Sequence, residues 1–149
     1  MTLPTLVFGW GNPARGDDAL GPMFVEAVEA MGLPGVECLT DFQLQVEHAL
    51  DLRGRSRILF VDASVSAAAP YCVEPLTAIR DDSFSSHAMT PAAVLQVFRD
   101  VEVEAPPPAV LLGIRGQQWE LGDPPSAMAL ENLSAALVWA QQWLTQPMA

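Results

Sequence analysis

The sequence predicts an α/β fold, a three-layer sandwich in which helices flank a twisted, mostly parallel sheet. Two observations lead to this class. Short apolar runs alternate with segments of helical periodicity, and the runs are continuous, as is typical of strands buried on both faces. A length of 149 residues, of which 50% are hydrophobic, is that of one packed domain over residues 1–149.

The first half of the chain predicts three strands and two helical segments. The strands are expected over residues 5–9, 36–39 and 58–61, where apolar, β-branched and aromatic residues cluster. Between the first two strands, a helix is expected to begin near Pro22, because proline suits the first helical position, and to stop at Gly32. Residues 44–52 follow a helical pattern, and Asp62 is expected to end the third strand.

The second half of the chain continues the alternation. A strand over residues 71–73 is expected near a sheet edge, because prolines bound it and proline cannot donate to a ladder. Thr90 followed by Pro91 predicts a helix start. A buried strand over residues 110–114 and a last helix over about 125–144 complete the predicted elements.

Charge and composition exclude several classes of protein. The chain has 18 acidic and 7 basic residues, and its net charge of -11 repels phosphate backbones and anionic membrane surfaces. We therefore expect no nucleic acid and no membrane among its partners. Every basic residue is an arginine, which excludes mechanisms that need a lysine.

Cysteine usage and the N-terminal segment indicate a cytoplasmic protein. Cys38 and Cys72 lie far apart in apolar segments, so we expect buried, reduced thiols rather than a disulfide. The first arginine is Arg15, so the charged region that begins a signal peptide is missing, and no apolar run approaches the roughly 18 residues of a membrane span. The pattern contains no heptad seam, so we expect a monomer.

Polar residues follow three of the apolar runs, at the strand ends where α/β sheets bind ligands. They are Asp17 and Asp18, Asp62, and His87. Carboxylate and imidazole suit a borderline divalent ion such as nickel or zinc. The alternatives are structural: the paired aspartates could favour the positive end of the following helix, and His87 could lie in a solvated loop. His48, within a helical pattern, is expected to be a surface or partly buried residue.

A dinucleotide-binding module is an alternative from another class. The spacing from Gly9 to Ala14 matches the G-x-G-x-x-A fingerprint, and Asp41 ends the second strand where a ribose-binding acid would lie. Such a site needs a helix N-terminus directly after the glycines, whereas the helix is expected only near Pro22. The two aspartates of the loop would also repel the phosphates.

Motifs of conventional proteases do not occur in the sequence. It contains neither G-x-S-x-G nor H-E-x-x-H, and two histidines cannot form a site of three imidazoles. Both cysteines fall inside predicted strands, where an exposed thiolate nucleophile is not expected. These observations fit a peptidase of another kind, and they also fit a protein without enzymatic activity.

Three motifs occur in order along the chain, GWGNPARGDDALG at 9–21, FVDA at 60–63 and SHAM at 86–89. Together they resemble the hydrogenase maturation endopeptidase family over about the first two thirds of the chain. The first motif is the most specific, because it places two glycines, an asparagine and an acid in one loop. Gln43-Leu44 and Arg115-Gly116 further resemble the branch that serves bidirectional, NAD-linked hydrogenases.

The resemblance implies a peptidase, aspartic-type or metal-assisted, that removes the C-terminal extension from a hydrogenase large-subunit precursor. The precursor would be a transient partner, and it would itself supply the nickel that is recognised. By position, the metal ligands of the family correspond to Asp18, Asp62 and His87, and the two aspartates are the candidate catalytic residues. Many relatives have glutamate in place of Asp18, and Asp17 is the adjacent alternative. A chaperone that senses nickel without cutting is a further alternative.

Overall fold

The structure, a computed structural model, describes residues 2–80 and 89–147. This part of the chain folds around a five-stranded sheet with the order β2-β1-β3-β5-β4. The strands are β1 (Thr5–Trp10), β2 (Val36–Asp41), β3 (Arg57–Ser64), β4 (Tyr71–Pro75) and β5 (Ala109–Arg115). All pairs are parallel except that of β4 with β5. The predicted mostly parallel sheet and the edge position of the fourth strand are confirmed.

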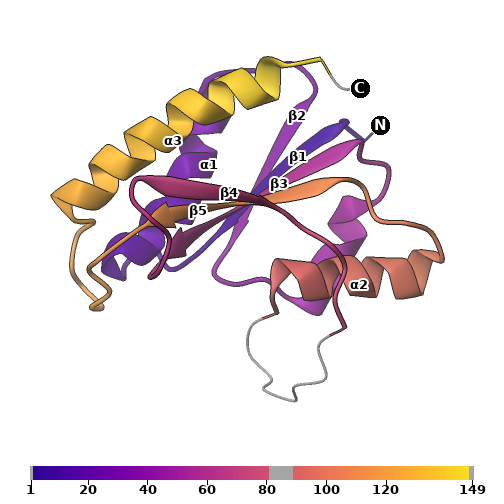
Figure 1. Ribbon diagram of the computed structural model, residues 1–149, viewed down its shortest axis with the longest axis horizontal. Helices are drawn as coiled ribbons and strands as arrows, with labels where there is room; N and C mark the ends of the chain where they lie inside the picture. The colour runs from indigo at the N-terminus through magenta and orange to yellow at the C-terminus, as the bar shows by residue number, and fades with distance from the viewer. Residues whose placement is uncertain (1, 81–88, 148–149) are drawn as a thin grey trace.

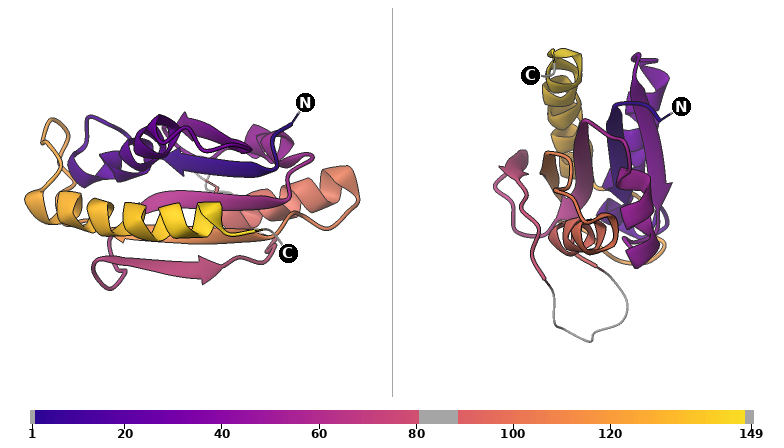
Figure 2. Two further views of the ribbon diagram at one scale, coloured as in Figure 1. Left: turned by 90° about the horizontal axis from the view of Figure 1, so that it is seen from above. Right: turned by 90° about the vertical axis from the view of Figure 1, so that its right-hand side faces the viewer.

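Helices cover both faces of the sheet, which confirms the predicted α/β sandwich (Figure 1). One face carries α1 (Leu20–Ala30) and α3 (Ala127–Thr145), and the other carries α2 (Pro91–Glu102) and the 3₁₀ segment η2 (Val46–Leu52). Figure 2 shows α3 running lengthwise beside the strands. We call the two sides the α1/α3 face and the α2 face.

Each face of the sheet has its own apolar core. On the α1/α3 face, Phe24 of α1 and Ala136 of α3 are fully buried. On the α2 face, Phe98 of α2 packs in a cluster with Phe60 of β3. Because successive residues of a strand point to opposite sides, Asp62 faces the same way as Phe60. The strand therefore directs Asp62 toward the α2 face.

Two element boundaries differ from the prediction. Helix α1 begins at Leu20 rather than near Pro22, because the 3₁₀ turn η1 (Gly16–Ala19) leads directly into it. Proline is tolerated here because first-turn N–H groups have no partner within the helix. Strand β3 continues to Ser64, so Asp62 lies inside the strand and does not end it, since β5 pairs with β3 as far as Ser64. The predicted start of α2 is confirmed, with the Thr90 side chain accepting from Ala93 N at 3.1 Å.

The cysteines are free, as predicted, but they are not both buried. Cys38 in β2 is half-buried and Cys72 in β4 is exposed. The expectation of two buried thiols was wrong for Cys72 because β4 is an edge strand. Within residues 2–80 and 89–147, no helix is long and apolar enough to span a membrane.

Candidate functional site

The candidate site lies at the carboxyl ends of β1 and β3. These strands are parallel neighbours, with Gly9 of β1 paired to Val61 of β3, so the next residues along each strand, Trp10 and Asp62, lie side by side. The Trp10 side chain hydrogen-bonds to the Asp62 carboxyl group, and the Ala63 backbone N–H also donates to it. Trp10 is buried against Phe60. An aromatic wall thus shields Asp62 from water on one side.

Asp18 approaches this point from η1, in the loop between β1 and α1. Its Oδ2 accepts the Asn12 backbone N–H at 2.7 Å, which fixes the carboxylate against the loop. Gly11 makes this geometry possible. A Cβ atom at Gly11 would lie 2.0 Å from the Asp18 carbonyl oxygen, and its φ of +146° belongs to the region that favours glycine. Gly11 of the first motif therefore has a local role, because it allows the backbone of Asp18 to pack closely against the loop.

The environment of Asp62 changes its ionisation. Burial is the largest cause that raises the pKa of Asp62, and the negative charge of Asp18 raises it further. The hydrogen bonds from Ala63 and Trp10 lower it in part, and the pKa of Asp62 comes to about 7. A carboxyl group that titrates near neutral pH can both accept and donate a proton, as a general acid–base catalyst must.

Asp17, the alternative to Asp18, has a different environment. It is fully buried, and both of its oxygens are occupied. Its Oδ1 accepts Ser126 N at 2.6 Å, and its Oδ2 accepts Gln117 N at 2.7 Å, Gln118 N at 3.0 Å and Ser126 Oγ at 2.8 Å. Burial acts to raise the pKa of Asp17, but these hydrogen bonds outweigh it and leave the pKa below its ordinary value.

These bonds give Asp17 a structural task. It ties η1 to the segment that leads from β5 into α3, and its own backbone N–H donates to Gln118 O at 2.7 Å. Gly16 belongs to the same junction, because a Cβ atom there would lie 2.3 Å from Gln118 O. The sequence left open which aspartate faces the site. The structure puts the charge of Asp18 beside Asp62, and it engages Asp17 in a separate buried network.

His87, the third predicted site residue, lies outside the described residues. Within residues 2–80 and 89–147, no group of three or more His, Cys, Asp or Glu side chains could hold a metal ion. Asp18 and Asp62 are the two predicted residues that the structure brings together. Carboxylate oxygens are reasonable ligands for nickel or zinc, although two of them do not make a complete set.

His48 is a structural residue. Its Nδ1 accepts Gln45 N at 2.8 Å, its Nε2 lies 3.1 Å from Asp41 Oδ2, and its ring meets the edge of Phe8 at 4.6 Å between centroids. With Nδ1 occupied as an acceptor, Nε2 donates to Asp41. The residue is buried and caps η2. Neither His48 nor Asp41 is directed at Asp62.

The glycines that resemble a dinucleotide fingerprint are used in another way. A Cβ atom at Gly9 would lie 2.5 Å from Gly21 O, and one at Gly21 would lie 2.3 Å from Trp10 O, so strand β1 and helix α1 touch through their backbones. The space beside the Gly11 Cα atom is occupied by the backbone of Asp18. In a dinucleotide site the second glycine is instead approached by pyrophosphate. The backbone of Asp18 therefore occupies the place beside Gly11 where a dinucleotide-binding site needs room for pyrophosphate.

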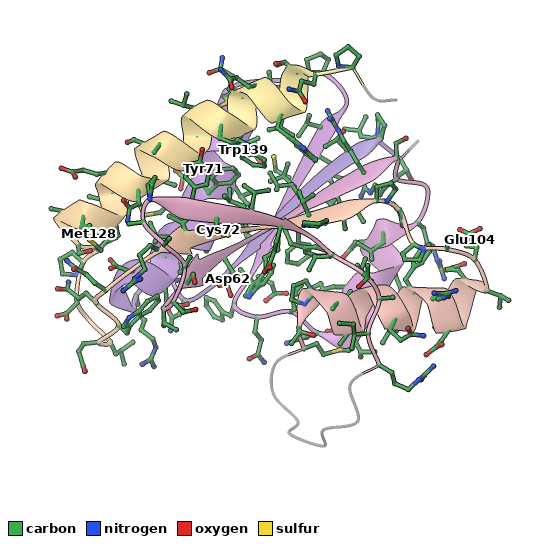
Figure 3. The ribbon with its side chains drawn as sticks, in the orientation of Figure 1. Asp62, Tyr71, Cys72, Glu104, Met128 and Trp139 are labelled. Carbon is green, nitrogen blue, oxygen red and sulfur yellow. The ribbon has the colours of Figure 1, made fainter. Side chains whose placement is uncertain are left out.

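A groove next to Asp62 was not predicted. A hollow of about 460 Å³ is lined by ten residues of β3, β4, β5 and the segment after β3: Asp62, Ala63, Ser64, Val65, Ser66, Ala67, Cys72, Glu74, Leu111 and Gly113. Figure 3 shows Asp62 and Cys72 at neighbouring places on the sheet. The one signal in the sequence was Gly113, which interrupts the apolar run of β5.

The fold can be compared with known structures. NiFe hydrogenase maturation protease HycI from Thermococcus kodakarensis KOD1 is similar with a TM-score of 0.74 and 19% identity, covering 97% of this chain and 94% of its own. The hydrogenase maturating endopeptidase HybD from E. coli is similar with a TM-score of 0.73 and 24% identity, and the match covers 95% of this chain and 91% of that one. The chain has the fold of the hydrogenase maturation proteases.

A third solved structure extends the comparison. An endopeptidase from Escherichia coli has a TM-score of 0.70 and 26% identity, and the match covers 95% of this chain and 91% of that one. No family model and no curated protein matches the sequence. The hydrogenase maturation protease fold predicted by the resemblance is thus supported by structure. The branch that serves bidirectional, NAD-linked hydrogenases is not supported by these neighbours and stays a prediction.

Proposed function

We propose that the protein is an endopeptidase that removes the C-terminal extension from a nickel-loaded hydrogenase large-subunit precursor. The observation that carries this proposal is the pair of Asp18 and Asp62 at the carboxyl edge of a sheet with the hydrogenase maturation protease fold. One member of the pair has a pKa of about 7, which suits proton transfer during peptide hydrolysis at neutral pH.

The reaction would divide the work between the two aspartates. Asp62 in its ionised form takes a proton from water as the oxygen of that water attacks the scissile carbonyl carbon. When the carbon–nitrogen bond breaks, Asp62 returns a proton to the departing amine. Asp18 is held beside Asp62 by the Asn12 N–H at 2.7 Å. Asp62 and Asp18 would each provide a carboxylate oxygen ligand for the nickel that the precursor carries.

His87 is proposed as the third ligand of that nickel, on the basis of the family resemblance. Support comes from Met89, two residues further along the chain. Met89 packs with the core of the α2 face, to which Asp62 also points, and its N–H donates to Leu44 O at 3.2 Å. A neutral imidazole is required for ligation, so binding through His87 would weaken as the pH falls through the histidine range near roughly 6.5.

The test is a processing assay read by intact mass. Purified protein is incubated with nickel-loaded and with nickel-free precursor, using the wild type, Asp18→Asn, Asp62→Asn and His87→Ala. We expect loss of a C-terminal peptide only from the nickel-loaded precursor. The rate should fall at least about 100-fold in Asp62→Asn, as removal of an acid–base group typically does, and it should also fall in Asp18→Asn and His87→Ala, because each loses a nickel ligand. Glu104→Gln removes an exposed carboxylate at the far end of α2 and should cleave like the wild type (Figure 3).

The other outcomes separate the alternatives. If the wild type binds nickel-loaded precursor without shortening it, and Asp62→Asn loses that binding, the protein is a nickel-sensing chaperone. If no precursor is bound or cut by well-folded protein, the proposed function is wrong. Saturable binding of NAD in a fluorescence titration would then favour the dinucleotide alternative.

A further inference from the structure

The groove beside Asp62 lies across three strands on the α2 face. Gly113 of β5 pairs with Asp62 of β3 on one side and with Cys72 of β4 on the other, so the three residues form one row and face the same way. Leu111 and Glu74 form the adjacent row, since they are also register partners. Residues 63–67 wall the end of the hollow. Neighbouring strands are about 4.8 Å apart, so the backbones at Asp62 and Cys72 lie roughly 10 Å apart, with the side-chain-free Gly113 between them.

Gly113 is not required by the backbone. A Cβ atom there would lie 3.4 Å from Ser64 Cβ and 4.0 Å from Ala67 Cβ, which are ordinary contacts, and its φ is not positive. Gly11 is the contrast, because its added Cβ atom would lie 2.0 Å from a carbonyl oxygen. Glycine in a strand interior weakens the strand or marks a close approach. What Gly113 provides is free space at the floor of the groove.

The charge of the groove is negative. Asp62 and Glu74 line it, and none of its lining residues is basic. Glu74 is exposed and has no ion-pair partner among the described residues. Arg115 is the nearby cation, but its Nη1 donates to Ala67 O at 2.8 Å and it is not among the residues that line the groove. A chain segment with a basic side chain therefore complements the groove.

We propose that this groove, lined by Asp62, Ser64, Ala67, Cys72, Glu74 and Gly113 and here called the Gly113 groove, binds an extended segment of the substrate next to the scissile bond. The backbone of that segment passes over Gly113, and Glu74 selects a basic side chain, Lys or Arg, within it. The inference rests on the proposed function and deepens it, because it places the precursor tail in a defined site. Asp62 belongs both to the catalytic pair and to the lining of the groove, so a segment bound in the groove lies next to the scissile carbonyl group.

The first test fills the groove at Gly113, and a rise in KM with little change in kcat distinguishes blocked substrate binding from a disturbed Asp62. Gly113→Leu should raise KM for nickel-loaded precursor and lower kcat/KM at least about 10-fold, because the side chain occupies the path of the substrate. Gly113→Ala adds a smaller side chain and should raise KM less. Val138→Leu, at an exposed position of α3 on the opposite face of the sheet, is the control and should leave KM unchanged. If Gly113→Leu folds normally and cleaves at the wild-type rate, the groove does not hold the substrate.

The charge of Glu74 is tested separately. Glu74→Gln and Glu74→Lys should raise KM progressively, whereas Glu104→Gln, at an exposed site far from the groove, should not (Figure 3). A precursor in which the basic residues of the tail are changed one at a time to Glu should regain cleavage by Glu74→Lys at one position. Equal KM values for all Glu74 variants would overturn the selection of a basic side chain.

A second readout does not depend on cleavage. Cys72 is exposed in the groove, while Cys38 is half-buried in β2. Burial, and then the charges of Glu29 and Glu37, raise the pKa of the Cys38 thiol to about 11, so iodoacetamide should modify Cys72 first. In the wild type, an excess of a nickel-free peptide that spans the cleavage site and the tail should slow modification of Cys72, and the same peptide with its basic residues changed to Glu should not. The rate at Cys38 is the internal control.

The outcomes separate this proposal from the proposed function. If the wild type cleaves the precursor but the tail does not protect Cys72, the function stands and the groove is wrong. If the tail protects Cys72 but nothing is cleaved, the groove binds the tail and the endopeptidase function is wrong. If there is neither cleavage nor protection, both are overturned.

Discussion

The ionised form of Asp62 destabilises the folded protein, and this effect can be measured as a pH dependence of the free energy of unfolding. Its pKa is raised from 3.8 to about 7 in the folded protein, first by burial and then by the charge of Asp18. Between these two pH values the folded state binds more protons than the unfolded state, so the free energy of unfolding falls as pH rises and levels off above about 7. The site thus carries an energetic cost at the pH where it would act.

The prediction is that Asp62→Asn stabilises the protein increasingly from pH 4 to pH 8. At pH 8 the gain should reach on the order of a few kcal/mol, because the amide cannot ionise. Urea unfolding at a series of pH values gives the difference between the variant and the wild type. Glu104→Gln, which removes an exposed carboxylate, should show no such trend. Parallel stability profiles for Asp62→Asn and the wild type would mean that Asp62 titrates normally.

Residue types alone predicted which side chains could form a site, but not how two adjacent aspartates would differ. Their places after apolar runs predicted Asp17, Asp18 and Asp62 as candidates, and the family resemblance favoured Asp18 over Asp17. The structure brings Asp18 and Asp62 together. The burial of Asp17 could not be predicted, because its partners Gln117, Gln118 and Ser126 lie about a hundred residues further along the chain. The free space beside Gly113 could not be predicted from the sequence for a similar reason. It depends on the register of three strands, which a single sequence does not show.

At the scale of elements, the N-terminus of α3 is the junction through which Asp17 organises the loop. Ser126 caps α3 by accepting Ala129 N at 3.2 Å, and its hydroxyl donates to Asp17 Oδ2 at 2.8 Å. Thr90 caps α2 in the same way, accepting Ala93 N at 3.1 Å, but its hydroxyl has no such buried carboxylate beside it among the described contacts. The two helices therefore form a matched comparison.

Ser126→Ala should lower the free energy of unfolding by about 2–3 kcal/mol, since it removes both a cap and a hydrogen bond to a buried charge. Thr90→Ala should lower it by about 1 kcal/mol, the usual value for a cap alone. Chemical denaturation at pH 7 measures both. The excess for Ser126→Ala should shrink when Asp17→Asn is also present, and equal losses in the two single variants would show that the bond to Asp17 contributes nothing.

Element types were predicted more accurately than element ends. Every strand predicted in the described residues is present, since continuous apolar runs mark strands that are covered on both faces. The errors at Pro22 and Asp62 arose where tertiary contacts extend an element. Helix α1 begins two residues earlier because η1, which Asp17 ties to the start of α3, leads directly into it, and β3 gains Asp62, Ala63 and Ser64 because β5 continues the ladder beside them.

At the scale of the whole molecule, the fold class followed from the alternation of strands and helices, whereas the surface did not. The apolar pattern says which residues are buried, and one sheet covered on two faces satisfies it. The groove lies at the edge of the sheet, where the α2 face is not fully covered. Strand β4 lies at the edge, so its α2-facing residues Cys72 and Glu74 remain exposed. An edge strand with polar and small side chains can form a binding surface without weakening the core.

The net charge of -11 predicts how the whole molecule responds to salt. Arg55 and Arg80 pair with Glu37 and Asp100, but 18 acidic residues outnumber 7 basic ones, so repulsion among unpaired carboxylates exceeds the attraction within pairs. The screening length falls from about 30 Å at 0.01 M salt to about 8 Å at 0.15 M. At pH 7 the Tm should therefore rise by a few degrees over this range of NaCl. Near the isoelectric point of about 4.3 the rise should vanish, because the excess negative charge is then neutralised. A Tm that falls with salt at pH 7 would instead show that ion pairs such as Arg55–Glu37, at 2.7 Å, dominate the electrostatic free energy of folding.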